Sequence, residues 1–205
     1  MLHLPATCIR SASHHARTGP VLNWVGETSG SLDIAAPKKA LFDAYADVER
    51  MPQWSSMLES VVLVDSQTRR SEWALRIPRP LARLVGAVGM GQLVRWEAVH
   101  ETEGCDVLRW RSLSGVQNSG EATFVERAGG ITTVSLRMTY TLPDLAGPLL
   151  SAPFAKRFVR RTMMRTMYTF KDTLEAEAVA SVVMEGGEHD VKASDPNVEQ
   201  TAEEV

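Results

Sequence analysis

Large aromatic side chains at alternating positions constrain this chain more than any other feature. From Leu58 to Tyr140, apolar and polar residues alternate with a period of two, which predicts antiparallel strands with one buried and one solvated face. The strands, or the turn just before them, place a ring on the buried side at Trp54, Trp73, Trp96, Trp110 and Tyr140. This is more ring surface than a small sheet needs to pack against one helix. We therefore expect a concave apolar surface that can hold a hydrophobic molecule.

Helices flank the predicted strands on both sides. Helical spacing after Pro37 predicts a helix over Lys38–Ala46, and Asp47 can cap a second short helix, Val48–Met51, that ends near Pro52. A long amphipathic helix follows the last strand and runs from about Pro153 to about Ala178. The predicted strands are 23–34, 58–65, 69–77, 93–99, 106–113, 120–126 and 132–141. The fold class is therefore α+β, with a curved antiparallel sheet of about seven strands around the long C-terminal helix.

The outward positions of these strands carry the charges. They include Arg95, Glu97, Arg109, Arg111, Glu121 and Arg137, whereas the inward positions hold no carboxylate. We interpret these residues as cross-strand pairs on a solvated face.

Composition sets the domain organisation. The chain has 205 residues, of which 44% are hydrophobic, so it is long enough for one domain with a real core. Residues 27–180 carry 19 bases and 18 acids. Such a neutral body argues against nucleic acid as a partner, because phosphate binding needs a basic excess. No stretch approaches the ~18–20 apolar residues of a membrane span. We expect three parts: a leader over 1–25, a ligand-binding domain over 26–180 and an acidic disordered tail over 181–205.

The leader and the tail have opposite charge. Residues 1–26 contain Arg10 and Arg17 and no acid, which is the composition of an organelle transit peptide. The alternative is a disordered N-terminus without a targeting role. The tail has seven acids against Lys192 alone, and we expect it to be disordered. The two cysteines, Cys8 and Cys105, predict neither a disulfide framework nor a metal site.

Three segments carry a recognisable pattern. They are Tyr45–Ser55 (YADVERMPQWS), Ser71–Leu75 (SEWAL), and the pair Trp110–Gly115 (WRSLSG) and Gly120–Phe124 (GEATF). With the element order, they resemble the START-like superfamily of helix-grip folds, most closely its polyketide cyclase/dehydrase and coenzyme Q-binding branch in cyanobacteria and plastids. The resemblance covers about residues 25–178. It implies a cavity between the sheet and the long helix that accepts a lipid or another hydrophobic molecule, and it implies no activity.

The candidate ligand-binding residues face that cavity. Indole N–H groups can reach the polar end of a ligand, and methionines offer an adaptable apolar wall. Ordinary core packing is the alternative for each of them, and Trp54 is expected to pack the helical turn onto the sheet. The candidates are Trp73, Trp96, Trp110, Ser112, Met138, Tyr140, Phe158 and Met167.

A basic cluster marks the first half of the long helix, where positive charge opposes the helix dipole. It consists of Lys156, Arg157, Arg160, Arg161 and Arg165. A solvated helix face is one explanation. The other is contact with anionic lipid headgroups, with the apolar loop Leu81–Met90 dipping into the membrane.

Groups for catalysis are scarce in the predicted domain. His100 is its only histidine and is expected in a solvated turn, Cys105 is expected to be exposed and inert, and Ser112 has no evident base. No metal-ligand cluster or cofactor fingerprint is present, so we expect no metal and no cofactor.

We therefore predict a carrier for a prenylquinone, isoprenoid or lipid that works near a membrane in an organelle, with the plastid stroma favoured over the mitochondrion. One alternative is a cyclase or dehydrase that acts on an aromatic or polyketide substrate. The other is an assembly factor that acts through protein–protein contact.

Overall fold

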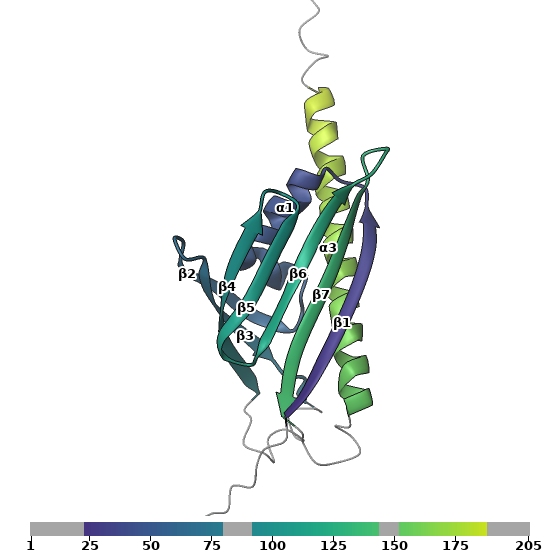
Figure 1. The fold of residues 1–205 in the computed structure, drawn as a ribbon. Coiled ribbons are helices and arrows are strands. Elements are labelled where there is room, and N and C mark those ends of the chain that lie inside the picture. The colour runs from purple at the N-terminus through teal and green to yellow at the C-terminus, as the bar shows by residue number, and fades with distance from the viewer. Residues whose placement is uncertain (1–22, 80–91, 144–151, 188–205) are drawn as a thin grey trace, which may run out of the picture.

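The computed structural model describes residues 23–79, 92–143 and 152–187, and seven antiparallel strands form its main layer (Figure 1). Their spatial order is β1-β7-β6-β5-β4-β3-β2, so the first strand pairs with the last along its whole length. The strands are β1 (Asn23–Ile34), β2 (Leu58–Asp65), β3 (Arg70–Arg76), β4 (Leu93–Glu103), β5 (Val107–Gly115), β6 (Asn118–Glu126) and β7 (Thr132–Pro143).

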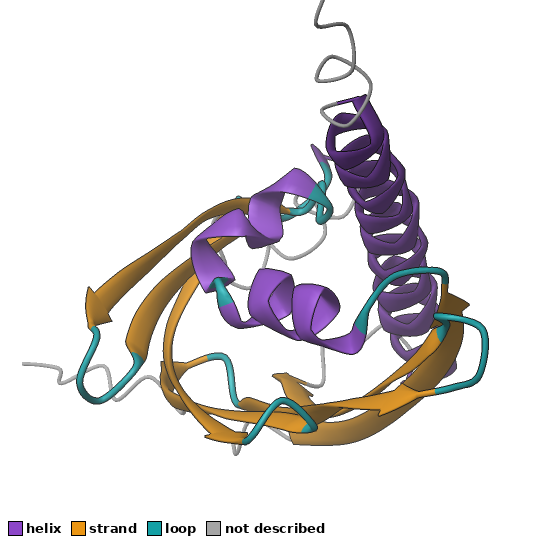
Figure 2. Ribbon diagram, turned by 90° about the horizontal axis from the view of Figure 1, so that it is seen from above, coloured by secondary structure: helices purple, strands orange, loops and turns teal. Residues whose placement is uncertain are grey.

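The helices lie on the concave side of this curved sheet. Figure 2 shows α1 (Lys38–Ala46) and the 3-10 helix η1 (Val48–Gln53) across the concavity, with α3 (Ala152–Gly187) along the β1 side. With 36 residues α3 is about 54 Å long. Its C-terminal end extends past the edge of the sheet (Figure 1). This arrangement confirms the predicted helix-grip α+β fold.

Two elements, β4 and α3, extend furthest beyond their expected bounds. β4 continues to Glu103 instead of ending at Val99, because Thr102 keeps the inward alternation and Gly104, at φ 55°, provides the tight turn into β5. The long helix continues past Ala178 to Gly187, since the added residues include no proline and no glycine before Gly186. Residues 181–187 of the expected disordered tail are therefore helical. The leader up to residue 22, the loop Leu81–Met90 and the tail from residue 188 lie outside the described residues.

A chain of aromatic rings links the sheet to all three helical segments. Phe124 of β6 packs edge-to-face with Phe42 and Tyr45 of α1, at centroid distances of 5.5 and 5.8 Å. Tyr45 in turn meets Phe170 of α3 at 5.8 Å, and Trp54, which follows η1, meets Phe170 at 5.0 Å. Trp54 is buried as expected, and its ring contact is with the long helix.

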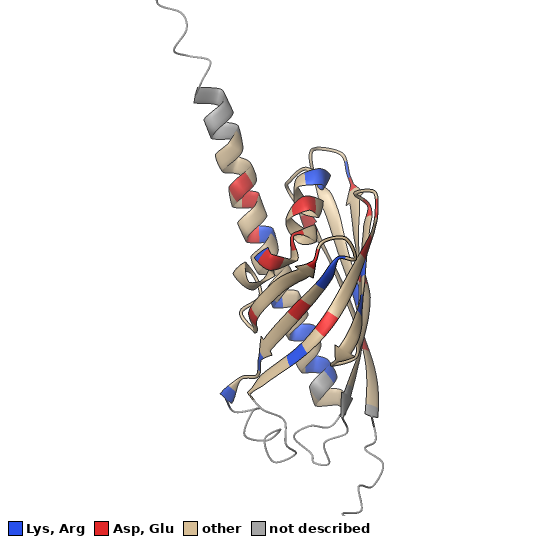
Figure 3. Cartoon of the chain, turned by 90° about the vertical axis from the view of Figure 1, so that its left-hand side faces the viewer, with Lys and Arg blue, Asp and Glu red and all other residues tan. Residues whose placement is uncertain are grey.

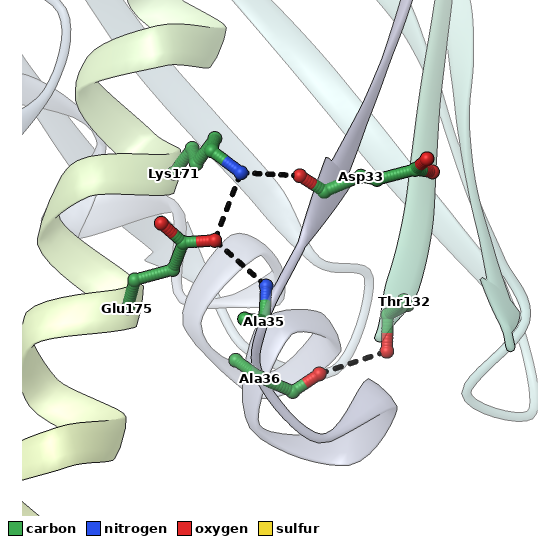
Figure 4. A network of polar contacts seen from close by, with 6 residues as sticks. All are labelled: Asp33, Ala35, Ala36, Thr132, Lys171 and Glu175. Atoms are coloured by element: carbon green, nitrogen blue, oxygen red, sulfur yellow. Dashed lines mark hydrogen bonds and ion pairs between the residues drawn. The ribbon is translucent and has the colours of Figure 1, made fainter. Parts of the chain in front are cut away.

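Polar contacts fix α3 to the connection between β1 and α1 (Figure 4). The Glu175 carboxylate accepts a hydrogen bond of 2.7 Å from the Ala35 N–H and pairs with Lys171 at 2.8 Å. Lys171 also donates to the Asp33 carbonyl at 2.5 Å. The buried Thr132 hydroxyl donates to the Ala36 carbonyl at 2.9 Å, which ties the start of β7 to the same connection. The middle of the helix is thus held by both rings and hydrogen bonds.

Candidate functional site

The sequence-predicted ligand residues of the strands gather on the concave face. Trp73 of β3 stacks on Trp96 of β4 at 5.6 Å with an interplanar angle of 18°. Trp110 and Ser112 follow on β5 and Met138 and Tyr140 on β7, all at inward positions of the strand register. Phe158 of α3 is half-buried and Met167 is buried. The strand register thus places these candidates on the inner face, as the period-two pattern predicts.

The indole donors of two tryptophans are already used within the protein. The Trp73 N–H donates to the Ser71 hydroxyl at 2.8 Å, and the Trp110 N–H donates to the Asn118 side-chain carbonyl at 3.1 Å. The Ser112 hydroxyl accepts from the Asn118 backbone N–H at 3.0 Å. The two tryptophans therefore offer a ligand the surface of their rings, while their indole N–H groups are already bonded to Ser71 and Asn118.

His100 does not lie in a solvated turn, so that expectation is wrong. Because β4 is longer than predicted, His100 occupies an inward position opposite Trp110 and is only 6% exposed. Its Nδ1 lies 3.3 Å from the Arg69 carbonyl and 3.4 Å from the Ser71 hydroxyl, and its ring packs against Trp73 at 5.8 Å. Burial lowers the pKa of His100 below its usual value near 6.5, which favours the neutral imidazole at neutral pH.

Cys105 also departs from expectation. It is half-buried and packs against the hydrophobic core, although it lies in the turn between β4 and β5. A partly covered thiol of this kind behaves mainly as a small apolar side chain.

The long helix packs closely against β1 at Gly30. A methyl group added at Gly30 would collide with the sulfur of Met164 and lie 3.1 Å from the Met163 methyl. Met167 is the next side chain, with its sulfur 3.4 Å from the same point. We call the inward residues of β1 and β7 beneath α3 the β1–β7 seam. It comprises Trp24, Gly26, Thr28, Gly30, Leu32, Leu136, Met138 and Tyr140.

A small apolar cavity of about 30 Å³ lies at the end of this seam marked by Leu32 and Leu136. It is bounded by Leu32 and Leu136 of the sheet, Met167 and Phe170 of α3, and Trp54. That volume matches one or two water molecules and is far below the 300–1,000 Å³ typical of ligand pockets. The side chains of Met163, Met164 and Met167 fill the space over Gly30 in this structure.

Three buried polar atoms near the seam and its cavity have no hydrogen-bond partner among the described residues. They are the hydroxyls of Thr28 and Tyr140 and the indole nitrogen of Trp54. Sequence reasoning missed Thr28, although the alternation of β1 places it inward. Burial raises the pKa of Tyr140, so its phenol stays protonated at neutral pH.

The outer face of the sheet has two open hollows of about 440 and 360 Å³. They are lined by charged residues such as Glu121 and Arg137, and most of these charges are paired across strands. Arg109 contacts Glu103 and Glu121, and Arg137 pairs with Glu27. The predicted cross-strand pairing is confirmed for these residues, and the hollows have the character of a solvated surface.

The basic cluster of α3 has no ion pair within the part of the chain that the structure describes. Figure 3 shows these positive residues in the N-terminal half of the helix and the acidic ones further along. Arg157, Arg161 and Arg165 form one exposed stripe with Phe154 and Tyr168, which are 44% and 51% exposed. Lys156 and Arg160 are exposed beside this stripe.

The described residues contain no group of three His, Cys, Asp or Glu side chains arranged to hold a metal ion. Within the same residues, no helix is both long and apolar enough to cross a membrane.

The buried, neutral His100 predicts a pH dependence of stability. Because the folded state disfavours the imidazolium, the unfolded chain binds more protons once the pH falls below about 6.5. We expect the free energy of unfolding in urea to fall between pH 7 and about pH 5.5, by at most about 1.4 kcal/mol per pH unit. A His100→Asn variant should lose this slope. An identical slope in the variant would contradict a neutral buried imidazole.

Comparison with known proteins agrees with this architecture. A family model for polyketide cyclase/dehydrase and lipid transport matches residues 26–175. Among curated proteins, none is significantly similar in sequence.

Solved structures share the fold at low sequence identity. A protein from Deinococcus radiodurans is 26% identical, covering 74% of this chain and 99% of its own, with a TM-score of 0.54. A START superfamily protein from Mycobacterium smegmatis is 13% identical over 73% of this chain and 97% of its own, with a TM-score of 0.58. The Zhui aromatase/cyclase from Streptomyces sp. R1128 is 16% identical over 78% of this chain and 96% of its own, with a TM-score of 0.54. On the match over residues 26–175, the chain belongs to the polyketide cyclase/dehydrase and lipid transport family.

Proposed function

We propose that this protein binds a neutral hydrophobic molecule between its sheet and α3 and carries or presents it near a membrane. The class we favour is a prenylquinone, isoprenoid or acyl lipid. The observation that carries the proposal is the β1–β7 seam, a half-buried to buried surface without inward Asp, Glu, Lys or Arg residues, over which three methionines of α3 pack at Gly30. A charged guest would lose its hydration there without gaining an ion pair.

Room for such a guest would come from movement of the methionines. Met163, Met164 and Met167 have unbranched side chains with several rotatable bonds, and they adapt to different neighbours more readily than branched residues do. The Trp73–Trp96 stack provides a flat apolar wall on the other side of the concavity. Burial of a hydrocarbon chain releases about 25 cal/mol for each Å² removed from water, which offsets this rearrangement.

Filling the seam tests the binding site. Met138→Trp places a large ring on the inner face of β7, whereas Thr139→Trp places the same ring on the outer face one residue later. We expect Met138→Trp to weaken binding of decylubiquinone at least about 10-fold, because overpacking removes the space the guest needs. The measurement is quenching of tryptophan fluorescence on titration with the quinone.

The Thr139→Trp variant is the matched control and should bind like the wild type. Circular dichroism and thermal unfolding establish that both variants are folded. Equal affinity in the two variants would place the quinone elsewhere and contradict the proposal.

Membrane contact is proposed for the exposed stripe of α3. Three arginines without ion pairs among the described residues lie between Phe154 and Tyr168 on one helical face. Arginines attract anionic headgroups at about 1 kcal/mol each near the surface, and aromatic rings favour the headgroup region. The orientation would bring the N-terminal half of α3, which covers the seam, to the membrane.

Charge reversal tests this contact. Arg157→Glu with Arg161→Glu should reduce cosedimentation with vesicles of phosphatidylglycerol and phosphatidylcholine at least about 10-fold, since four units of charge change. The control is Arg95→Glu with Arg111→Glu, which changes the same charge at exposed positions on the outer face of the sheet. An equal loss in both variants would indicate a nonspecific charge effect and overturn a docking role for the stripe.

An enzymatic role is the second candidate, and His100 is the observation that favours it. A neutral imidazole on the concave face can accept a proton, and its Nδ1 is near the Ser71 hydroxyl. The Zhui aromatase/cyclase has the same fold. Conversion of a polyketide substrate by the wild type, lost in His100→Asn, would favour this function over carriage. The organelle, and the plastid in particular, stays a prediction from the leader and the family resemblance.

A further inference from the structure

Two buried hydroxyl groups lie on the adjacent strands β1 and β7, at the end of the β1–β7 seam marked by Trp24 and Tyr140. Thr28 and Tyr140 are 5% and 4% exposed, and neither hydroxyl has a hydrogen-bond partner among the described residues. Buried hydroxyls are normally paired, because burial without a partner costs stability. Two of them on adjacent strands are therefore unusual, because other buried hydroxyls, those of Ser71 and Thr132, donate to backbone carbonyls.

The register of β1 and β7 makes these two residues neighbours on the inner face of the sheet. Tyr140 is opposite Gly26, and Thr28 is opposite Met138, so the two residues are diagonal neighbours on the inner face. The Tyr140 ring folds over Gly26, since a Cβ at that position would lie 2.6 Å from the ring carbon Cζ that bears the hydroxyl. Thr28 is the next inward residue, about 7 Å further along β1. The absence of a side chain at Gly26 is what allows the phenol to reach across β1.

The surroundings select the kind of group that can bind here. Trp24 packs edge-to-face against Tyr140 at 5.7 Å, and Met138 and Met163 are apolar neighbours along the seam. Burial raises the pKa of Tyr140, so the phenol is a hydrogen-bond donor at neutral pH. The threonine hydroxyl can also donate. Two donors among uncharged neighbours match a neutral acceptor oxygen and leave a carboxylate without a counter-charge.

We infer that Thr28 and Tyr140 form the headgroup subsite of the proposed ligand site and that they take a neutral carbonyl oxygen, as in a quinone, ketone or ester. The hydrocarbon part of the molecule then runs along the seam under Met163, Met164 and Met167 toward the cavity beside Trp54. This inference rests on the proposed function, because it assumes that the seam opens to a hydrophobic guest.

Conservative variants remove each hydroxyl and keep the shape of the side chain. The variants are Tyr140→Phe and Thr28→Val, and the matched control is Thr139→Val on the outer face of β7. The probes are a long-chain methyl ketone and the alkane of the same chain length. Each competes with the neutral fluorophore N-phenylnaphthylamine for the purified full-length protein.

We expect each inner variant to bind the ketone about 3–10-fold more weakly, the value of one net hydrogen bond. Binding of the alkane should be unchanged, and the Thr139→Val control should bind both probes like the wild type. Thermal unfolding gives a second readout. If the hydroxyls have no partner in the protein, the ligand-free Tyr140→Phe and Thr28→Val variants should be as stable as the wild type or more stable.

Several results would overturn the headgroup subsite. These are an equal loss for ketone and alkane, no loss for the ketone, or a clear drop in unfolding temperature in both inner variants. A wild-type protein that binds the alkane and the ketone equally well would remove the subsite and leave the proposed carrier function standing. A wild-type protein that binds neither probe nor the fluorophore would overturn the carrier function itself.

Discussion

The aromatic contacts around Phe170 hold the rest of this structure in place. Phe170 of α3 touches Tyr45 of α1 and Trp54 after η1, and Tyr45 also touches Phe124 of the sheet. Each edge-to-face pair adds about 0.5–1.5 kcal/mol to the burial of its rings. The Lys171 and Glu175 contacts to Asp33 and Ala35, at the connection between β1 and α1, follow directly after Phe170 on the same helix. The middle of α3 is therefore fixed by both kinds of interaction.

The N-terminal half of α3 is held differently, and this difference gives the molecule its function in our account. Its methionines Met163, Met164 and Met167 pack against Gly30 of β1. Its outward face carries arginines without ion pairs among the described residues, whereas the acids further along pair with Arg50 and Lys171. One adaptable apolar surface and one basic surface thus share the same stretch of helix. A membrane contact through these arginines would therefore act directly on the methionines that cover the seam.

Much of the fold follows from the sequence because periodicity reports burial directly. The bounds of β1, α1 and β2 match the residues 23–34, 38–46 and 58–65 expected from the pattern, and the inward aromatics lie where alternation places them. Alternation did not reveal how far β4 extends, since Glu101, Thr102 and Glu103 look like a turn until β5 pairs with them. Because of that error, His100 was expected in solvent, whereas the structure places it in the interior. Hydrogen-bond partners were also beyond prediction. Trp73 and Trp110 donate to other side chains, whereas the Tyr140 and Thr28 hydroxyls have no partner in the part of the chain that the structure describes. Which polar groups are free depends on neighbours brought together by pairing across strands, and no single segment contains that information.

The most direct test of the central claim is native mass spectrometry of the full-length protein as purified, followed by extraction and identification of what it carries. Our account predicts a stoichiometric neutral hydrophobic molecule with a carbonyl-type head, released on unfolding. A protein that is empty, and whose tryptophan fluorescence does not change with any of a panel of quinones, isoprenoids and lipids, would contradict it.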